Sequence, residues 1–308
     1  MATSPRVNPT KFRYTCPMIR IGVDIGGTKI EAAALDALGR FNARVRVPTP
    51  PAYEDRLDAT RTAVLEAERQ AGVLTARIGV GGPGSPSPVT GLMRNSNSTV
   101  LNDKPFPADL ERVLGRPIRY ANDANCLALS EATDGAAAGA GVVFGVIIGT
   151  GCGAGIAVGA QPVPGRNLIA GEWGHTPLPW PRPDELPGPS CWCGRRNCLE
   201  LWLSGTGFAR EAGQSAEAAV AAGNNDAIDR YIDRLSRSLA VVVDILDPDI
   251  IVLGGGMSNI EQLYADLPAA IAPHVFSDVF TTPVVKALHG DSSGVRGAAW
   301  LWPLEPGG

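Results

Sequence analysis

The chain has 308 residues, of which 44% are hydrophobic and 19% charged, with a formal net charge of −4 at pH 7. This balance is typical of a globular protein with one large domain or two lobes. The acidic charge argues against a nucleic-acid partner, and no apolar run approaches the roughly 20 residues of a membrane helix. Residues 1–17 lack the apolar core of a secretory signal, so we interpret them as a disordered or non-native extension before Met18. We therefore expect a cytoplasmic protein without a membrane partner.

The first 134 residues predict an α/β layer. An apolar run ends in Gly26-Gly27-Thr28-Lys29, and apolar alternation then resumes, which is typical of two strands joined by a glycine turn. Later strands and helices are expected from apolar runs and from helical spacing. The expected elements are strands at 19–24, 31–35, 78–80 and 118–121, and helices at 53–71, 107–114 and 124–134.

The second half repeats the strand, glycine turn and strand of the first. Residues 142–148 and 154–158 flank a turn at Gly149-Thr150-Gly151-Cys152-Gly153. A helical pattern over 216–246, a strand at 250–253 followed by Gly254-Gly255-Gly256, and a final helix at 295–301 complete the chain. This repetition of a strand, a glycine turn and a strand predicts two lobes with related folds.

The glycine turns are candidate phosphate-binding loops, because glycine lets backbone N–H groups approach phosphate oxygens closely. Thr28 and Lys29 would add donors, and Asp24 at the strand end could hold hydrated Mg²⁺. The spacing is not that of a Walker P-loop. An ordinary hairpin turn remains the alternative for each turn, and a flexible connector is the alternative for residues 254–256.

Asn122 and Asp123 follow the expected strand at 118–121. A phosphoryl acceptor needs a carboxylate that orients its hydroxyl and accepts its proton, and a strand end in a crevice suits that role. The Asn amide could bind a second hydroxyl of the same ligand. Taken alone, this pair is more often a turn or a helix N-cap.

His175, Cys191, Cys193 and Cys198 form a Cys₃His set that suits tetrahedral Zn²⁺. With all four bound no coordination position stays open, so we interpret the zinc as structural. Three free cysteines close together by accident are the alternative. A nucleic-acid-binding finger is disfavoured because no basic helix accompanies the cluster, and a chain of this length without an export signal is not expected to carry a disulfide framework.

Five motifs in this order resemble the ROK family (repressor, open reading frame, kinase). They are DIGGTK at 24–29, NDAN at 122–125, GTGCGAG at 149–155, GEWGH at 171–175 and CWCGRRNCLE at 191–200. The resemblance implies a two-lobed actin-like ATPase (ribonuclease H-like) fold with a cleft, and an ATP-dependent sugar kinase that forms a homodimer. It places residues 18–123 and a C-terminal helix within 291–308 in a small lobe, and 124–290 in a large lobe with the zinc-binding loop.

The resemblance also implies residue roles. Asp123 would be the catalytic base, and His175 would serve both zinc and sugar. The sugar ligands would be Gly82, Asn97, Asn122, Asp123, Glu172 and His175. The ATP contacts would be Asp24, Gly26, Gly27, Thr28, Lys29, Gly149, Thr150, Gly151, Gly153, Gly254, Gly255 and Gly256.

Trp192 stands where some glucokinases of the family carry a glutamate, which argues against glucose. Segments 95–102, 171–180, 247–259 and 289–303 are similar to bacterial fructokinases of the mannofructokinase type. We therefore expect a fructokinase acting at O6, with an N-acetylglucosamine, glucose or mannose kinase as alternatives. A sugar-sensing repressor is a remote alternative, because too few residues precede the first strand for a DNA-binding domain, and a structural actin-like ATPase is another.

Overall fold

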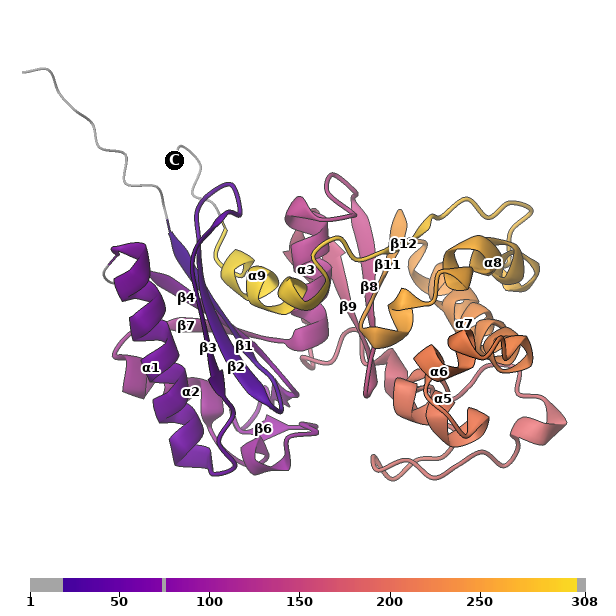
Figure 1. Cartoon of the computed structure of the whole chain (residues 1–308), viewed down its shortest axis with the longest axis horizontal. Helices are drawn as coiled ribbons and strands as arrows, with labels where there is room; N and C mark the ends of the chain where they lie inside the picture. The colour runs from indigo at the N-terminus through magenta and orange to yellow at the C-terminus, as the bar shows by residue number, and fades with distance from the viewer. Residues whose placement is uncertain (1–18, 74–75, 304–308) are drawn as a thin grey trace, which may run out of the picture.

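The computed structural model describes residues 19–73 and 76–303, and the extension expected at 1–17 lies outside them. Two lobes lie side by side, each built around a five-stranded sheet, and two helices lie between the sheets (Figure 1). None of the helices in the described ranges is long and apolar enough to span a lipid bilayer.

The first sheet has the strand order β3-β2-β1-β4-β7. Its strands are β1 (Arg20–Ile25), β2 (Lys29–Leu35), β3 (Phe41–Pro48), β4 (Arg77–Gly82) and β7 (Ile118–Asn122). The first three strands are antiparallel, whereas β4 and β7 run parallel to β1. The outer face is covered by α1 (Tyr53–Ala71) and α2 (Phe106–Leu114), and a small hairpin of β5 (Ser85–Pro86) and β6 (Met93–Arg94) precedes η1 (Thr99–Leu101) (Figure 1).

The second sheet repeats this topology in the order β10-β9-β8-β11-β12. Its strands are β8 (Val142–Ile148), β9 (Cys152–Val158), β10 (Gln161–Pro162), β11 (Ile250–Gly254) and β12 (Val284–Lys286). The antiparallel β8, β9 and β10 correspond to β1, β2 and β3, and the parallel β11 and β12 correspond to β4 and β7. The duplication expected from the two glycine turns is therefore a duplication of the whole sheet.

The outer side of the second lobe is helical (Figure 1). Its helices are α4 (Glu200–Leu203), α5 (Gly205–Ala212), α6 (Ala216–Ala221), α7 (Asn225–Leu246) and α8 (Gln262–Ile271). Short 3-10 turns complete the chain: η2 (Trp173–His175), η3 (Pro183–Glu185), η4 (Gly256–Asn259), η5 (Ala272–His274) and η6 (Gly290–Ser292).

Two helices, α3 (Asp123–Asp134) and α9 (Ser293–Trp300), occupy the space between the sheets (Figure 1). They approach the strands closely because glycines lie beneath them. A Cβ on Gly22 of β1 would collide with the backbone of α9, and one on Gly155 of β9 would collide with the backbone of α3. Gly297 allows α9 to lie against Cys126 of α3 in the same way. This contact holds the first turn of α3 at the junction of the lobes.

The helical spacing of apolar residues predicted a helix at 53–71, and the structure has α1 with the same bounds. Leu57, Val64 and Ala67 form its buried stripe, and Gly72 ends it in the left-handed conformation at φ 67°. The helical pattern at 216–246 is divided, since Ser215 and Asn224 cap two separate helices. Sequence analysis missed β3, because this edge strand exposes most of its polar side chains.

Candidate active site

The carboxyl ends of the parallel strands in the first sheet bring three candidate residues side by side. Asp24 is in register with Gly81, and Gly82 is in register with Asn122. Asp123 follows as the first residue of α3. The Asn122 side-chain oxygen and Asp123 Oδ1 both accept from the backbone N–H of Ala124, at 2.8 Å each. Asn122 is therefore the N-cap of α3, and this cap fixes where the Asp123 carboxylate emerges.

Both acidic side chains have raised pKa values. Burial raises the pKa of Asp123 to about 6, and the negative charge of Glu172 adds to this effect. Burial raises the pKa of Asp24 to about 7, with a further contribution from the charge of Asp123. Two carboxylates that oppose each other's ionisation form a place where a divalent cation would be stabilised. Raised pKa values of this kind are common at functional sites.

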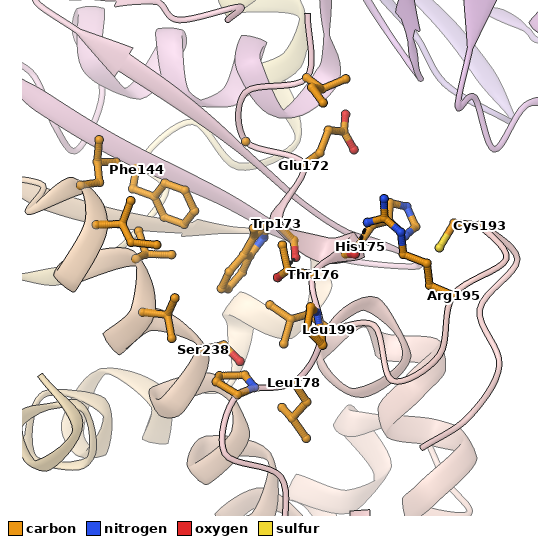
Figure 2. A pocket seen from close by; sticks show the side chains of 18 of the residues that line it. Phe144, Glu172, Trp173, His175, Thr176, Leu178, Cys193, Arg195, Leu199 and Ser238 are labelled. Carbon is orange, nitrogen blue, oxygen red and sulfur yellow. Dashed lines mark hydrogen bonds between the residues drawn. The ribbon is translucent and has the colours of Figure 1, made fainter. Parts of the chain in front are cut away.

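Glu172 approaches this pair from the second lobe. Burial raises its pKa, the Glu200 charge raises it further, and the Arg94 charge opposes the shift. Figure 2 shows that Glu172 and Trp173 point to opposite sides of the chain, with Trp173 turned toward Phe144. Arg94 donates to the backbone oxygen of Asn167 at 2.5 Å, so a side chain of the first lobe already contacts the second.

The first glycine turn joins β1 to β2. The Gly26 N–H donates to the Lys29 carbonyl at 3.0 Å, and the Thr49 hydroxyl donates to the Gly26 carbonyl at 2.8 Å. No atom outside the neighbouring residues lies within 4 Å of the position that a Cβ on Gly27 would occupy. The Lys29 ammonium lies 3.9 Å from Glu31. These hydrogen bonds therefore fix the base of the turn, while its tip at Gly27 stays open, as a phosphate-binding loop requires.

The second glycine turn contacts two other segments. The Gly205 N–H donates to the Gly149 carbonyl at 2.7 Å, and the Thr206 hydroxyl donates to the Thr150 carbonyl at 2.8 Å. Gly255, at φ 85°, lies against the backbone of Ile148 and Gly149. Sequence analysis did not single out the Ser204–Thr206 segment, although Ser204 before two glycines is an N-cap signal for α5.

The glycines at 254–256 are not equivalent. A Cβ on Gly254 would collide with Leu127 of α3, and one on Gly255 would collide with Ile148. Only Gly256 has open space around it, with no such atom within 4 Å. Gly255 is therefore required by packing against backbone, Gly254 meets the end of one buried side chain, and Gly256 is free to face a ligand.

The four candidate metal ligands converge, with donor atoms all within 4.8 Å of one another. Cys193 Sγ lies 3.6 Å from Cys198 Sγ, and His175 Nδ1 lies 3.7 Å from Cys191 Sγ. Tetrahedral zinc with Zn–S bonds of about 2.3 Å would separate its sulfur ligands by about 3.8 Å. The donor set and its spacing thus fit zinc, and they leave His175 Nε2 on the side of the ring away from the cluster.

Glu200 is a residue that sequence analysis missed. Its carboxylate accepts from the Trp192 indole N–H at 2.7 Å and from the Cys152 backbone N–H at 3.3 Å. The Trp192 ring meets the His175 ring edge to face, with centroids 4.9 Å apart. Glu200 therefore joins the loop that carries Cys191, Cys193 and Cys198 (the cysteine loop) to the second glycine turn. No spacing rule singled out Glu200, since it reaches this turn only through α4.

The other two predicted sugar ligands, Gly82 and Asn97, lie in different surroundings. Gly82 is buried in β4, where a Cβ would lie 3.1 Å from the Tyr120 hydroxyl. Asn97 is exposed in the loop between β6 and η1, and no hydrogen bond joins it to the other candidates within the described residues. The role of Asn97 as a sugar ligand stays a prediction.

A cavity of about 820 Å³ adjoins this cluster on the second lobe (Figure 2). Glu172, His175 and Trp192 line one part of it, and apolar side chains of β9 and α7 line the rest. Asp123 and the glycine turns are not part of its lining. Glu172 is therefore the member of the acidic cluster that also lines this cavity.

Comparisons with known proteins agree with this geometry. The family model described as the ROK family matches residues 20–305. The chain belongs to the ROK family. An N-acetyl-D-glucosamine kinase of Salmonella paratyphi C is 38% identical over 297 residues, which cover 91% of this chain and 98% of that protein.

Solved ROK structures share the fold. The ROK hexokinase from Thermus thermophilus is 32% identical with a TM-score of 0.79, over 92% of this chain and 97% of the other. A ROK family glucokinase from Streptomyces griseus, in complex with glucose and AMPPNP, is 29% identical with a TM-score of 0.75, over 92% and 98%. The two-lobed actin-like ATPase fold and a sugar kinase activity that uses ATP are thereby confirmed.

The narrower resemblance to fructokinases of the mannofructokinase type is not supported by these comparisons. The curated relative reported above is named for N-acetyl-D-glucosamine. The alternative of an N-acetylglucosamine kinase therefore fits these comparisons better than the fructokinase expected from segments 95–102, 171–180, 247–259 and 289–303.

Proposed function

We propose that this ROK kinase transfers the γ-phosphoryl group of ATP to the primary hydroxyl of a hexose, and that N-acetyl-D-glucosamine is its substrate. The observation that carries the proposal is the position of Asp123. Its half-buried carboxylate begins α3 at the junction of the lobes, beside Asp24 and under the charge of Glu172. The 38% identity to an N-acetyl-D-glucosamine kinase supports the choice of sugar.

Asp123 would accept the proton of the attacking hydroxyl. A base works best when its pKa lies near the working pH, so a pKa of about 6 leaves Asp123 ionised at neutral pH yet able to hold the proton. Asn122, Glu172 and His175 would bind other hydroxyls of the sugar and orient the primary hydroxyl. In phosphoryl transfer such positioning, together with charge stabilisation, supplies most of the catalysis.

The nucleotide would lie along the two glycine turns, with Gly256 nearest the base. The open tips at Gly27 and Gly149 would offer backbone N–H groups to the phosphates. Asp24 would hold Mg²⁺, since its oxygens are the hard ligands that this ion prefers. The ion would neutralise charge on the phosphates and would return the Asp24 carboxyl to its ionised form.

Zinc would be bound by His175, Cys191, Cys193 and Cys198, whose spacing fits a closed tetrahedral site. Its contribution would be structural. By fixing the ring of His175 it would hold Nε2 toward the sugar, and it would also hold the loop that carries Trp192.

Fructose is the second candidate, and the observation in its favour is the similarity of segments 95–102, 171–180, 247–259 and 289–303 to bacterial fructokinases; Trp192 argues only against glucose. A coupled ADP-release assay with ATP, Mg²⁺ and a panel of hexoses decides between the sugars. N-acetylglucosamine should give the highest kcat/KM among N-acetylglucosamine, glucose, mannose and fructose, with Asp123→Ala as the blank. A fructose preference would reject the proposed sugar and keep the kinase, and no turnover with any sugar would reject the kinase.

A further inference from the structure

A second cavity, of about 320 Å³, lies between the lobes beside Asn122. Residues of the first lobe line one side, including Ser85, and the Gln161–Pro162 strand and the following loop line the other. Asn122 contacts both this cavity and the acidic centre, because it is the residue directly before Asp123. A sugar held at Asp123 would therefore lie next to a residue of the cavity lining.

Two buried polar atoms in this lining have no partner. Ser85 is only 5% exposed, and its hydroxyl makes no hydrogen bond within the described part of the chain. The side-chain oxygen of Asn125, one turn into α3, is also buried and without a partner there. An unsatisfied buried polar atom costs roughly 1–3 kcal/mol, so two of them in one cavity indicate that a ligand completes their hydrogen bonds.

The rest of the lining limits what that ligand can be. Six apolar side chains contribute to it, namely Pro86, Ala121, Pro162, Pro164, Leu168 and Leu301. Among residues 19–73 and 76–303, no carboxylate lines the cavity. The Arg119 guanidinium is already engaged, since it donates to the Leu301 carbonyl at 2.5 Å and lies 4.3 Å from the Trp302 ring centre. The cavity thus suits a small neutral group with one donor, one acceptor and an apolar end.

We propose that this cavity is the acetamido subsite, a conclusion that rests on the proposed function. The Ser85 hydroxyl would donate to the acetamido carbonyl, and Asn125 Oδ1 would accept from the acetamido N–H. The methyl group would pack among the prolines and Leu168. Ser85 and Asn125 would then determine the preference for an N-acetylated sugar over the same sugar with a hydroxyl at that carbon.

The arrangement of Ser85 makes this role specific. Ser85 pairs with Arg94 in the small hairpin of β5 and β6, and Arg94 contacts the second lobe at Asn167. Gly84 before it has φ 79°, and a Cβ there would lie 2.5 Å from the Arg94 carbonyl. The hairpin is therefore fixed, and the serine hydroxyl is held at the cavity rather than in solvent.

The test compares N-acetylglucosamine with glucose, which differ only in this substituent. Ser85→Ala and Asn125→Ala should each lower the ratio of kcat/KM for N-acetylglucosamine to kcat/KM for glucose by about tenfold, the effect of one lost hydrogen bond. Ser130→Ala is the matched control. Its hydroxyl lies on α3 like Asn125, is also buried and makes no hydrogen bond within the described ranges, but it does not line the cavity, so the ratio should not change.

Binding by titration calorimetry separates the two proposals. The subsite is supported if the affinity for N-acetylglucosamine falls in Ser85→Ala and Asn125→Ala but not in Ser130→Ala. This holds even if the chain phosphorylates neither sugar. An unchanged ratio and affinity in both variants would overturn the subsite. Failure of the wild-type chain to bind N-acetylglucosamine while it phosphorylates another hexose would also overturn it and leave the kinase standing.

Discussion

The indole N–H of Trp192 donates to Glu200 Oε1 at 2.7 Å, while Glu200 Oε2 accepts from the backbone N–H of Cys152 at 3.3 Å. One carboxylate thus joins the cysteine loop to the second glycine turn. We assign the second glycine turn to nucleotide binding. Its conformation therefore depends in part on Trp192, which lies between the candidate metal ligands Cys191 and Cys193.

Replacing Trp192 by phenylalanine should weaken nucleotide binding. The ring would still meet His175, but Glu200 would lose its donor and the second turn would lose part of its support. We expect the Kd for a non-hydrolysable ATP analogue to rise about threefold, since a partly exposed hydrogen bond contributes less than about 1 kcal/mol. Trp180→Phe, which changes an exposed tryptophan stacked on His274, is the control and should leave this Kd unchanged. Equal effects of the two changes would contradict the linkage.

The rate should depend on the protonation of Asp123. Because only the ionised carboxylate accepts a proton, kcat/KM should fall about tenfold per pH unit below about pH 6. Glu172 raises the pKa of Asp123 through its charge, so Glu172→Gln should move this acidic limb to lower pH while raising the KM for sugar. The measurement is a pH profile of kcat/KM for both proteins. A limb at the same pH in Glu172→Gln would show that the two carboxylates do not interact.

Asp24→Asn should stabilise the fold at alkaline pH. The pKa of Asp24 rises from 3.8 to about 7 on folding, so the folded protein binds this proton more tightly than the unfolded chain. Stability therefore falls as pH rises between these values, and the loss is complete above about pH 7. Calorimetry without nucleotide or Mg²⁺ should show a Tm for Asp24→Asn that is roughly 2–6 °C higher at pH 8, and no gain at pH 4. A lower Tm at pH 8 would contradict the burial argument.

Cys193→Ser should lose zinc and stability together, because metal binding is coupled to folding. Atomic absorption should find about one zinc per wild-type chain and much less in the variant, with a Tm that no longer responds to chelator. Cys126→Ser is the control: it disturbs packing between α3 and α9 but should keep its zinc. A variant that keeps the wild-type Tm would refute the structural role.

The glycines at 254 and 256 should respond differently to alanine. Gly254→Ala should lower the free energy of unfolding by about 1–3 kcal/mol, since its Cβ would collide with Leu127. Gly256→Ala has free space and should keep its Tm, while weakening nucleotide binding if the base lies there. Thermal melts and nucleotide titrations of both variants check this. Similar Tm losses in both would show that Gly256 is also a packing glycine.

Many residues of the candidate site could be predicted from the local sequence. Asp123 follows an apolar strand and starts a helix, so its place at a strand end needed no tertiary information. The Cys₃His set was recognisable because metal ligands leave a compositional signature. Glu200, Arg94 and Ser85 were missed, since each reaches the site through a short element whose position depends on the rest of the fold.

By itself the sequence determined the family, the duplicated strand and glycine-turn theme and the metal ligand set, because these depend on residue type and spacing along the chain. Only the tertiary structure decided which glycines face open space and which lie under a helix, since that depends on where α3 and α9 pack. It also decided how the acidic residues interact. Asp24, Asp123 and Glu172 are far apart in sequence. The charge of Asp123 raises the pKa of Asp24, and that of Glu172 raises the pKa of Asp123, only because the fold brings these side chains together in surroundings of low dielectric.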